Sequence, residues 1–464
     1  MAENTFDLVV IGSGPAGYVA AARAARLGGR VALVEKDDLG GTCLNRGCIP
    51  TKTLIHGVSV LSTVVEAASW GVVCDRPTLD MAALHAKKDA VVTGLAQGVA
   101  KLLSASGVTV FQGLGQVPAP ETVTVSAPDG QRRLTARNIL LSLGARPAMP
   151  PIPGLNLPGV VTSDALLAAT DIPESLAIIG GGVIGMEFAC LYAGLGTRIT
   201  VIEAAAHILP SVDEELQKRL IPLWKRRGVT VERGAAVTEI VKQDDKLAVR
   251  YKGRTGPAET VCRRVLSAVG RLPMPTEGVV TVPGLEREGP FVAVDAGMRT
   301  SLPGIYAAGD LVPGPMLAHV ASAEGLVAAE NALGGSAVMD YDAIPACIYT
   351  APEIAGVGLT EDAARRRGLH VRIGHSSYGT NGRAQTLGEP FGLVKLVADA
   401  DDGRLLGAHL FGAQASELVA EATLAVKNRL TVRQLAQTVH SHPSLSETLA
   451  EAAQGLLDEQ SRVA

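Results

Sequence analysis

The sequence places two cysteines, Cys43 and Cys48, in a glycine-flanked segment that ends with Lys52. Residues spaced i, i+5 in a regular helix lie about 8.5 Å apart at Cα, whereas the Cα atoms of a disulfide lie roughly 4.4–6.8 Å apart. The pair can therefore bridge only if Cys43 lies in the glycine-rich lead-in and Cys48 in a distorted first turn. There the helix dipole and Lys52 would lower the pKa of the Cys48 thiol and favour the thiolate.

We interpret the pair as a redox-active dithiol that opens and closes during turnover. A metal half-site and two buried thiols are the alternatives, but a metal site needs further ligands at short spacing, and none follows. A lone close-spaced pair is typical of a catalytic site in the cytosol, which is the compartment we expect. The other cysteines have apolar neighbours and are expected to be buried thiols: Cys74, Cys190, Cys262 and Cys347.

The segment ahead of the dithiol carries a dinucleotide-binding pattern of strand, Gly-x-Gly-x-x-Gly, helix, strand and acid. The elements are expected over Phe6–Ile11, Tyr18–Leu27 and Arg30–Val34, and the glycines are Gly12, Gly14 and Gly17. In order, the glycines permit the turn, admit the pyrophosphate and let the helix pack on the strand, while Glu35 accepts bonds from the ribose hydroxyls. Because the dithiol follows at once, the favoured ligand is a flavin, which exchanges two electrons with a thiol pair.

A second copy of the pattern lies further along the chain. Its elements are expected over Ser175–Ile179, Met186–Leu195 and Arg198–Ile202, and its glycines are Gly180, Gly182 and Gly185. Glu203 ends the second strand, and no basic residue stands from Ala204 to Ala206. An acid at this place bonds a free ribose 2′-hydroxyl and repels a 2′-phosphate, which favours NAD over NADP. We interpret the nearby His207 as structural.

Two further segments carry candidate functional residues. Asp310 ends a short strand and precedes a helix expected over Leu317–Leu333, so it is placed to bind a ribityl hydroxyl, although a turn residue is the alternative. The helix N-terminus would stabilise negative charge on a reduced isoalloxazine. Near the C-terminus, His442 and Glu447 have the spacing of a base held by an acid. The alternative is a helix cap in which Ser444 and Glu447 form a capping box, and the two are compatible.

Length and composition indicate an α/β protein of about three domains. Apolar residues make up 47% of the chain and Gly occurs 52 times, as expected for tight turns between strands and helices. The net charge of −4 gives no electrostatic reason to expect nucleic acid or an anionic membrane as partner. We find no signal peptide and no segment long enough to span a membrane.

Three boundaries divide the chain. The proline-rich run 149–158 is a linker, Gly270–Pro273 marks a second boundary, and the composition changes at Ile344. The expected segments are an FAD-binding domain with the dithiol, an NAD-binding domain, a central part that completes the FAD domain, and a C-terminal interface domain, over 1–148, 149–272, 273–343 and 344–464.

With these parts named, the chain resembles the dithiol flavoprotein disulfide reductases over essentially its whole length, and within them the members that oxidise dihydrolipoamide. The resemblance rests on residues 40–52, both glycine patterns, and the motifs at 308–310, 315–319, 349–353 and 440–447. It implies two Rossmann-like domains, for FAD and NAD, and a C-terminal α+β dimerisation domain. It also implies a homodimer that serves the lipoyl domains and acyltransferase core of 2-oxo acid dehydrogenase complexes or the glycine cleavage system, and no metal.

The resemblance assigns roles residue by residue. Cys43 would be the interchange thiol and Cys48 the flavin-side thiol, with His442 as base and Glu447 as its orienter, the base reaching the dithiol of the opposite subunit. Lys52 and Glu187 look like the family's ion pair beneath the flavin. The implied FAD residues are Gly12, Gly14, Gly17, Glu35, Lys52, Gly115, Gly144, Asp310, Met316, Leu317, Ala318 and His319. The implied NAD residues are Gly180, Gly182, Gly185, Glu187, Glu203, Val237 and Gly270.

Three departures from the family pattern stand out. Arg46 stands where a small apolar residue is usual, and we hypothesise that it lowers the thiol pKa values further or favours an acidic substrate. Leu143-Gly144-Ala145 replaces Thr-Gly-Ser, which removes the side-chain hydroxyls at that crossing, and Thr51 replaces a common Ser.

The rival relatives fit less well. Glutathione reductase needs basic residues near Glu203, and mercuric reductase carries cysteines near its C-terminus, whereas the last cysteine here is Cys347. A redox sensor or scaffold that binds flavin without turnover is the alternative from another class, but a scaffold has no need of a base opposite a dithiol.

Overall fold

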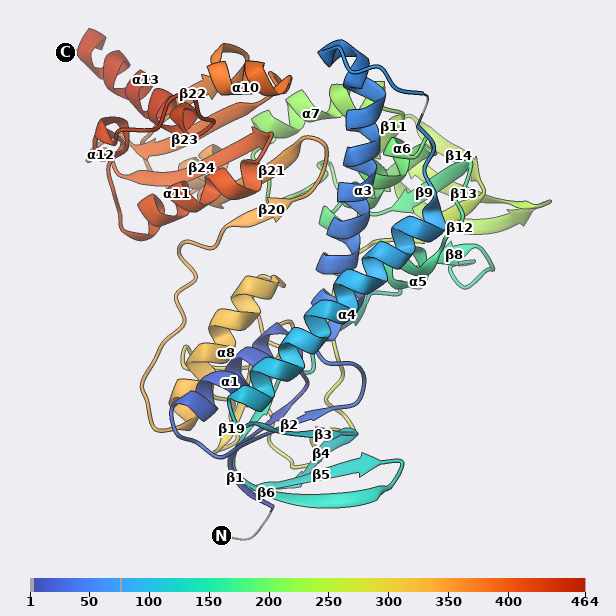
Figure 1. Ribbon diagram of the computed structural model, residues 1–464, viewed down its shortest axis with the longest axis vertical. Coiled ribbons are helices and arrows are strands. Elements are labelled where there is room, and N and C mark those ends of the chain that lie inside the picture. Colours follow the sequence, from blue (N-terminus) through green and yellow to red (C-terminus); the bar gives the residue numbers. More distant parts are fainter. Residues whose placement is uncertain (1–3, 76, 464) are drawn as a thin grey trace. The chain divides into compact units, whose positions relative to one another are not determined.

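A computed structural model describes residues 4–75 and 77–463 (Figure 1). The chain forms two compact units, and each is described by itself. The first comprises Met1–Met149, Thr162–Asp171 and Gly270–Asp340, and the second Pro150–Val161, Ile172–Val269 and Tyr341–Ala464. The predicted boundaries of four segments stay predictions.

A seven-stranded sheet in the order β3-β2-β1-β6-β5-β4, with β19 beside β6, forms the centre of the first unit. The central strands β2, β1, β6 and β19 run parallel, and β4 and β5 form an antiparallel meander with β6. Its strands and those of two short ladders are β1 (Thr5–Ile11), β2 (Val31–Glu35), β3 (Thr109–Gln112), β4 (Leu114–Ala119), β5 (Thr122–Ala127), β6 (Gly130–Leu141), β7 (Ala145–Pro147), β16 (Arg271–Pro273), β17 (Arg287–Glu288), β18 (Phe291–Val292) and β19 (Ile305–Ala307).

The first unit also contains the helices that pack on this sheet and those that carry the dithiol. They are α1 (Pro15–Arg26), α2 (Gly41–Arg46), α3 (Cys48–Glu66), the 3₁₀ helix η1 (Ala67–Trp70), α4 (Met81–Ala105), α5 (Ser163–Ala168) and α8 (Ala318–Ala332). Helices α1 and α8 lie side by side, and a Cβ on Gly325 would lie 2.3 Å from the carbonyl oxygen of Ala16. Glycine is therefore required for this close approach of α8 to α1 (Figure 1).

The second unit contains a parallel sheet in the order β11-β10-β9-β15-β8 and an antiparallel sheet β12-β13-β14. Their strands are β8 (Val160–Val161), β9 (Ser175–Ile179), β10 (Arg198–Glu203), β11 (Val229–Arg233), β12 (Ala236–Gln243), β13 (Lys246–Gly253), β14 (Gly256–Cys262) and β15 (Arg264–Ser267), with helices α6 (Val183–Gly194) and α7 (Glu214–Arg226). A core of aliphatic side chains from both sheets, such as Ile179 and Val249, joins them.

The C-terminal part of this unit is an antiparallel sheet in the order β20-β21-β24-β23-β22 with helices packed on it. Its elements are β20 (Ala346–Ile348), β21 (Glu353–Gly358), α9 (Glu361–Arg366), β22 (Val371–Ser377), η2 (Tyr378–Thr380), α10 (Gly382–Leu387), β23 (Leu393–Asp399), β24 (Leu405–Gly412), α11 (Ala415–Lys427), α12 (Val432–Gln437) and α13 (Glu447–Val463). The α/β class with two dinucleotide folds and a C-terminal α+β domain is thus confirmed.

Both predicted strand–helix–strand units form at the expected places, with small differences at their ends. Helix α1 begins at Pro15 rather than Tyr18, because Gly14 is the N-cap and proline fits the first helical position, where its missing N–H costs nothing. Strand β9 has the predicted bounds Ser175–Ile179.

The expectation that no segment is long enough to span a membrane is wrong by length and composition. Residues Gly41–Trp70, which form α2, α3 and η1, have a mean hydropathy of 1.3 and sufficient length. In the structure this segment is interrupted at Gly47, between α2 and α3, and Thr51, Leu54 and Val58 are buried in the fold.

Cys74 does not match its prediction either, because its thiol is exposed. It follows Val72 and Val73 in a segment after η1, where these apolar neighbours are themselves exposed, so apolar sequence context did not indicate burial. Cys262 is buried as expected, and Cys190 and Cys347 are partly covered.

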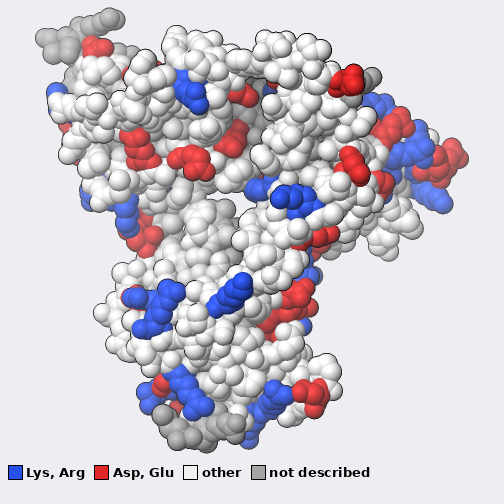
Figure 2. All heavy atoms as spheres, in the orientation of Figure 1, with Lys and Arg blue, Asp and Glu red and all other residues white. Residues whose placement is uncertain are grey.

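Charged side chains of both signs are interspersed on the face shown in Figure 2. Within single helices of the structure, some charged side chains are paired one turn apart, as Lys218 is with Glu214 and Arg365 with Glu361. On that face neither sign gathers into a large patch, in line with the small net charge.

Candidate functional site

The first glycine pattern has the geometry of a dinucleotide turn. Gly12 has φ +100°, and a Cβ there would lie 2.4 Å from the carbonyl oxygen of Ser142. A Cβ on Gly17 would lie 1.9 Å from the carbonyl oxygen of Gly12, whereas one on Gly14 would meet nothing within 4 Å. Gly12 and Gly17 are thus required by the fold, and the space beside Gly14 is left for a ligand at the N-terminus of α1, where anions bind.

The carboxylate of Glu35 at the end of β2 is fixed by the backbone around it. Its Oε2 accepts hydrogen bonds from the Ser13 N–H at 2.8 Å and the Ser13 hydroxyl at 2.6 Å, and its Oε1 accepts from the Asp37 N–H at 2.8 Å. A carboxylate has about four acceptor sites, so Glu35 is oriented by these bonds and keeps capacity for ribose hydroxyls. Ser13 was not predicted, since nothing in the glycine pattern distinguishes its middle residues.

The second glycine pattern repeats this arrangement. Gly180 has φ +106°, a Cβ on Gly185 would lie 2.0 Å from the Gly180 carbonyl oxygen, and a Cβ on Gly182 would meet nothing within 4 Å. Glu203 accepts from the Gly181 N–H at 2.6 Å and from the Ala205 N–H at 2.7 Å. The two predicted sites are therefore built alike, each with an open position beside its second glycine.

The dithiol segment is packed directly on the first glycine pattern. The Gly40 N–H donates to the carbonyl and hydroxyl oxygens of Ser13 at 3.2 and 3.1 Å, and a Cβ on Gly41 would lie 2.6 Å from the Gly14 Cα. Two glycines thus bring α2 into contact with the turn that would hold the pyrophosphate. The structure brings the dithiol and the first dinucleotide site together, as their order in the sequence suggested.

Cys48 is the first residue of α3, as expected, but Cys43 lies within the short helix α2 rather than in an irregular lead-in. The break at Gly47 separates the two helices and lets the thiols meet. A hydrogen bond with Cys48, burial and the charge of Cys48 together raise the pKa of Cys43, against a smaller opposing effect of Lys52. The reduced pair therefore keeps its proton on Cys43 when Cys48 is the thiolate.

Arg46 has an acidic partner of its own, and its hypothesised effect on the thiol pKa values or on the choice of substrate stays a prediction. Its guanidinium pairs with Asp37 at 3.0 Å, both side chains are about half exposed, and Arg46 is not among the groups that shift the pKa of Cys43. The charge near the dithiol comes instead from Lys52.

Asp310 lies just after β19, where the loop before α8 approaches α1. A Cβ on Gly309 would lie 3.4 Å from the Cβ atoms of Ala16 and Ala321, and the Gly309 N–H donates to the buried Glu324 at 2.7 Å. Burial raises the pKa of Asp310, and Arg271, 4.0 Å away, acts in the opposite direction. The predicted residues Met316 and Leu317 precede α8 in the same region, with Leu317 as its N-cap, and Ala318 and His319 are its first two residues. Glu324 and Arg271 were not predicted.

The segment Leu143-Gly144-Ala145, between β6 and β7, lacks the side-chain hydroxyls of the family pattern, and other hydrogen bonds fix it. The Ser142 hydroxyl donates to the Gly12 carbonyl at 2.9 Å, and Arg271 donates to the Ala145 carbonyl. The Met274 N–H donates to Gly144 and the Ala148 N–H to Gly270, each at 2.9 Å, on either side of the β7–β16 ladder. Gly144 and Gly270, predicted for different cofactors, therefore both lie in the first unit.

Three further predicted residues lie in β4, β12 and α6. Gly115 in β4 packs on Ile11 and Val34, where a Cβ would approach within 3.0 and 3.1 Å. Val237 in β12 packs on the core of the second unit. Glu187 is buried on α6, where its Oε1 accepts from the Tyr349 N–H at 3.0 Å. The predicted pairing of Glu187 with Lys52 stays a prediction.

The loop after Glu203 is tied to the second glycine pattern and to the C-terminal sheet. The Leu209 N–H donates to Gly181 at 2.9 Å, and Asp213 caps α7 by accepting from the Glu215 N–H at 3.0 Å. Lys395 of β23, only 3% exposed, donates to Asp213 at 3.0 Å and to Glu361 at 2.7 Å. None of these buried partners was predicted, since they are far apart in sequence.

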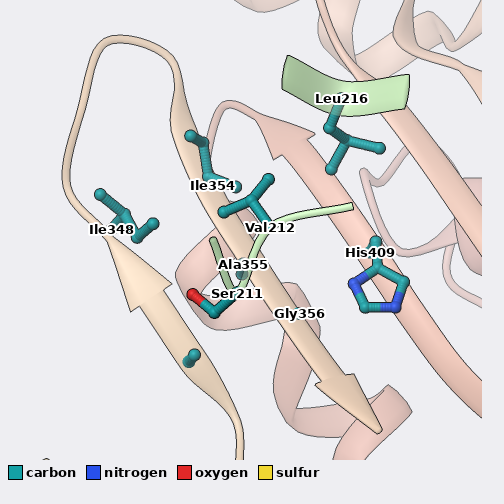
Figure 3. A pocket seen from close by; sticks show the side chains of 9 residues that line it. Ser211, Val212, Leu216, Ile348, Ile354, Ala355, Gly356 and His409 are labelled. Atoms are coloured by element: carbon teal, nitrogen blue, oxygen red, sulfur yellow. The ribbon is translucent and has the colours of Figure 1, made fainter. Parts of the chain in front are cut away.

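A small pocket opens beside this cluster (Figure 3). Ser211, Val212 and Leu216 face it from the loop and α7, and Ile348 and His409 face it from strands β20 and β24. Burial lowers the pKa of His409, whose Nε2 lies 3.0 Å from the Leu359 carbonyl oxygen. This pocket contains no predicted site residue, and it marks the contact between the α7 loop and the C-terminal sheet.

His442 and Glu447 form the expected pair in the second unit. Their Nδ1 and Oε1 lie 2.9 Å apart, and the His442 side chain is 79% exposed. A hydrogen bond from the Ser444 N–H at 2.8 Å and the bond to His442 lower the pKa of Glu447. The Glu447 carboxylate thus accepts from the Ser444 N–H, as in a capping box, and also orients His442. The Ser444 hydroxyl pairs instead with the hydroxyl of Ser446. With Nδ1 donating to Glu447, neutral His442 presents its Nε2 lone pair outward.

Comparisons with known proteins agree with this architecture. Residues 6–325 match the model of the pyridine nucleotide-disulphide oxidoreductases, and residues 344–453 match the dimerisation domain of that family. The expected homodimer is thereby confirmed. Among the described residues, no group of three or more His, Cys, Asp or Glu side chains has the arrangement of a metal site.

Curated relatives that match over nearly the whole chain include enzymes named dihydrolipoyl dehydrogenase. Dihydrolipoyl dehydrogenases of Thermus scotoductus and Bacillus subtilis are 41% and 38% identical over 98% and 97% of both chains. The crystal structure of LpdA from Mycobacterium tuberculosis has a TM-score of 0.88 at 29% identity, covering 96% of this chain and 99% of its own. The Escherichia coli flavoprotein disulfide reductase RclA, as its Cu(II) complex, has a TM-score of 0.86 at 28% identity, covering 97% and 99%. The chain belongs to the pyridine nucleotide-disulphide oxidoreductase family and is an oxidoreductase that uses FAD and NAD(H).

Proposed function

We propose that the chain is a dihydrolipoyl dehydrogenase, which oxidises protein-bound dihydrolipoamide and reduces NAD⁺. The observation that carries the proposal is the packing of Gly40 and Gly41 on Ser13 and Gly14, which sets a dithiol against a dinucleotide turn. The names of the full-length relatives support the substrate. The absence of basic residues from Ala204 to Ala206 supports NAD.

The proposed functional residues form two cofactor sites and include one base that carries protons. FAD would lie along Gly14, Glu35 and Asp310, and NAD along Gly182 and Glu203, in the open positions that the geometry leaves. When bound, the flavin takes an electron pair from the dithiol and passes hydride to NAD⁺. The chain itself orients these groups and moves the protons.

The thiol steps follow from the roles of Cys43, Cys48 and His442. His442 Nε2 takes the proton of one dihydrolipoyl thiol, and the resulting thiolate attacks Cys43 Sγ. The Cys43–Cys48 bond breaks and Cys48 leaves as thiolate. His442 releases the first proton to solvent and takes the proton of the second substrate thiol. This second thiolate displaces Cys43, which receives that proton from His442, and lipoyl disulfide is released. The raised pKa of Cys43 suits its return to the protonated form.

Association and location belong to the same proposal. In the homodimer, His442 of the partner subunit would serve the Cys43–Cys48 pair, so one subunit would hold no complete site. The lipoyl domain and the acyltransferase core of a 2-oxo acid dehydrogenase complex, or the glycine cleavage system, would be the partners, and the cytoplasm the compartment.

A steady-state assay of the purified holoenzyme tests the function. Reduction of NAD⁺ by dihydrolipoamide is followed beside reduction of NADP⁺, and beside glutathione disulfide with NADH or NADPH. NAD-specific turnover that disappears in Cys43→Ser supports the proposal. Turnover of a different disulfide, with none of dihydrolipoamide, would overturn the substrate and keep the dithiol chemistry.

A further inference from the structure

The first histidine of the His-Ser-His motif lies in a closed environment, unlike the second. The side chain of His440 is 7% exposed, against 79% for His442. Its Nε2 lies 2.8 Å from Oε1 of Glu421 on α11, and its Nδ1 lies 2.8 Å from the Thr438 carbonyl oxygen.

These contacts hold the imidazole ring of His440 from both sides. Both ring nitrogens face acceptors, since a backbone carbonyl and a carboxylate oxygen have no proton to give. A neutral imidazole has one N–H, so its other nitrogen would face an oxygen at 2.8 Å lone pair to lone pair. Only the imidazolium donates at both positions, and the Glu421 carboxylate compensates its buried charge.

The ion pair fixes one side of the segment that carries His442. This segment joins α12 to α13, and Glu421 ties it to α11. On the other side, Leu445 is buried in the core and the Ser444 carbonyl oxygen accepts from the Nδ2 of the buried Asn381 at 3.0 Å. His442 therefore lies exposed between two anchored points, and its own side chain has Glu447 as its hydrogen-bonding partner.

The charge of His440 also reaches the orienting acid. After the bonds from Ser444 and His442, the charge of His440 contributes to lowering the pKa of Glu447. Glu421 from α11 and Glu447 from α13 therefore both interact with His440. A cation here helps keep Glu447 ionised, as an acceptor for His442 Nδ1.

We propose that His440, held as an imidazolium by Glu421, is a positioning residue that sets the place of His442 and supports the charge of Glu447. This inference rests on the proposed function, in which His442 is the base. It predicts that removing either partner of the His440–Glu421 pair slows deprotonation of the dithiol substrate without affecting the two cofactor sites.

The test uses the FAD-loaded dimer and the variants His440→Gln, Glu421→Gln, their double variant and His442→Gln. Oxidation of dihydrolipoamide is compared with the oxidation of NADH by a quinone, a reaction that needs the cofactors and no thiol base. We expect kcat for dihydrolipoamide to fall about tenfold or more in each single variant with its KM within about twofold, because a slightly misplaced base costs rate rather than binding. The double variant should lose no more than either single one.

His375→Gln is the matched control, because His375 pairs with Glu215 at 3.0 Å outside the His442 segment. It should leave the thiol reaction unchanged. Unchanged kcat in His440→Gln, beside a large loss in His442→Gln, would overturn this inference alone. Equal losses of the thiol and quinone reactions, or of bound FAD, would assign His440 to folding and also overturn it. No effect of His442→Gln would overturn the assignment of the base in the proposed function.

Discussion

The Nζ of Lys395 lies 3.0 Å from Oδ1 of Asp213, with both side chains only 3% exposed, and joins the C-terminal sheet to the N-cap of α7. Glu215 and Glu361 lie 3.3 and 2.7 Å from the same ammonium. The loop before Asp213 reaches the second glycine pattern through Leu209 and Gly181. One buried cation thus organises the acids at the start of α7, beside the NAD site.

Substitution of this cation should destabilise the protein strongly. Lys395→Met leaves Asp213 buried and the other carboxylates without their cation, so we expect a loss of about 3–5 kcal/mol in the free energy of unfolding. Denaturant unfolding of the holoenzyme measures it. The exposed pair Lys218–Glu214 on α7 gives the control, and Lys218→Met should cost less than about 1 kcal/mol. Equal effects of the two substitutions would contradict the assignment.

The same cluster should make stability sensitive to acid. Burial would raise the pKa of Glu215, but bonds from Arg219 and His375 and the charge of Lys395 outweigh it and lower the pKa to about 2. The bond from Lys395 likewise lowers the pKa of Glu361. A carboxyl with a depressed folded pKa stabilises the fold above its unfolded pKa and loses this contribution as the pH falls towards the folded value.

The acid window for Glu215 therefore runs from about pH 4.5 down to about pH 2. Unfolding free energy measured across this range should fall less steeply in Glu215→Gln than in the unchanged protein. The exposed Glu174, which pairs with Arg198, provides the comparison. Parallel curves for the unchanged protein and Glu215→Gln would show that the cluster does not set the acid response.

Alanine substitutions at the second and third glycines of the NAD pattern should affect different properties, NAD⁺ binding and stability respectively. Gly182→Ala adds a methyl group where the fold leaves open space, so stability should hold while KM for NAD⁺ rises about tenfold or more, because that space is the approach to the pyrophosphate. Gly185→Ala places a Cβ 2.0 Å from the Gly180 carbonyl oxygen and should cost about 1–3 kcal/mol of stability.

Thermal unfolding together with NAD⁺ kinetics separates these two effects. Gly94→Ala, in the exposed interior of α4 with nothing within 4 Å of its Cβ, is the control and should be neutral or stabilising. If Gly182→Ala unfolded as readily as Gly185→Ala, the open space at Gly182 would not be a ligand position.

The sequence predicts local features of this site well, because a glycine pattern is a short-range constraint. Gly12, Gly17, Gly180 and Gly185 meet backbone oxygens at distances that exclude a Cβ, so their spacing alone identified them. The placement of Cys48 at a helix N-terminus likewise depends on residues close to it in the sequence.

Long-range partners could not be predicted. Lys395 and Asp213 are 182 positions apart, and Glu187 and Tyr349 are 162 apart, so no spacing relates them. Ser13, which fixes Glu35, stands at a position where the glycine pattern allows any residue. Apolar neighbours also led to a wrong prediction of burial for Cys74, because sequence does not show which apolar segments find a packing partner.

Arg46 provides the remaining prediction, in which the structure changes the expectation. Its guanidinium is paired with Asp37 and does not shift the pKa of Cys43. We therefore expect Arg46→Val to leave the pH dependence of dihydrolipoamide oxidation unchanged, since about half-exposed charges are screened by water and salt. Asp37→Asn is the matched variant: if it frees Arg46 to face the thiols, the pH–rate profile should shift there and not in Arg46→Val. A shifted pH–rate profile in Arg46→Val would contradict this expectation and support the hypothesis that Arg46 acts on the dithiol directly.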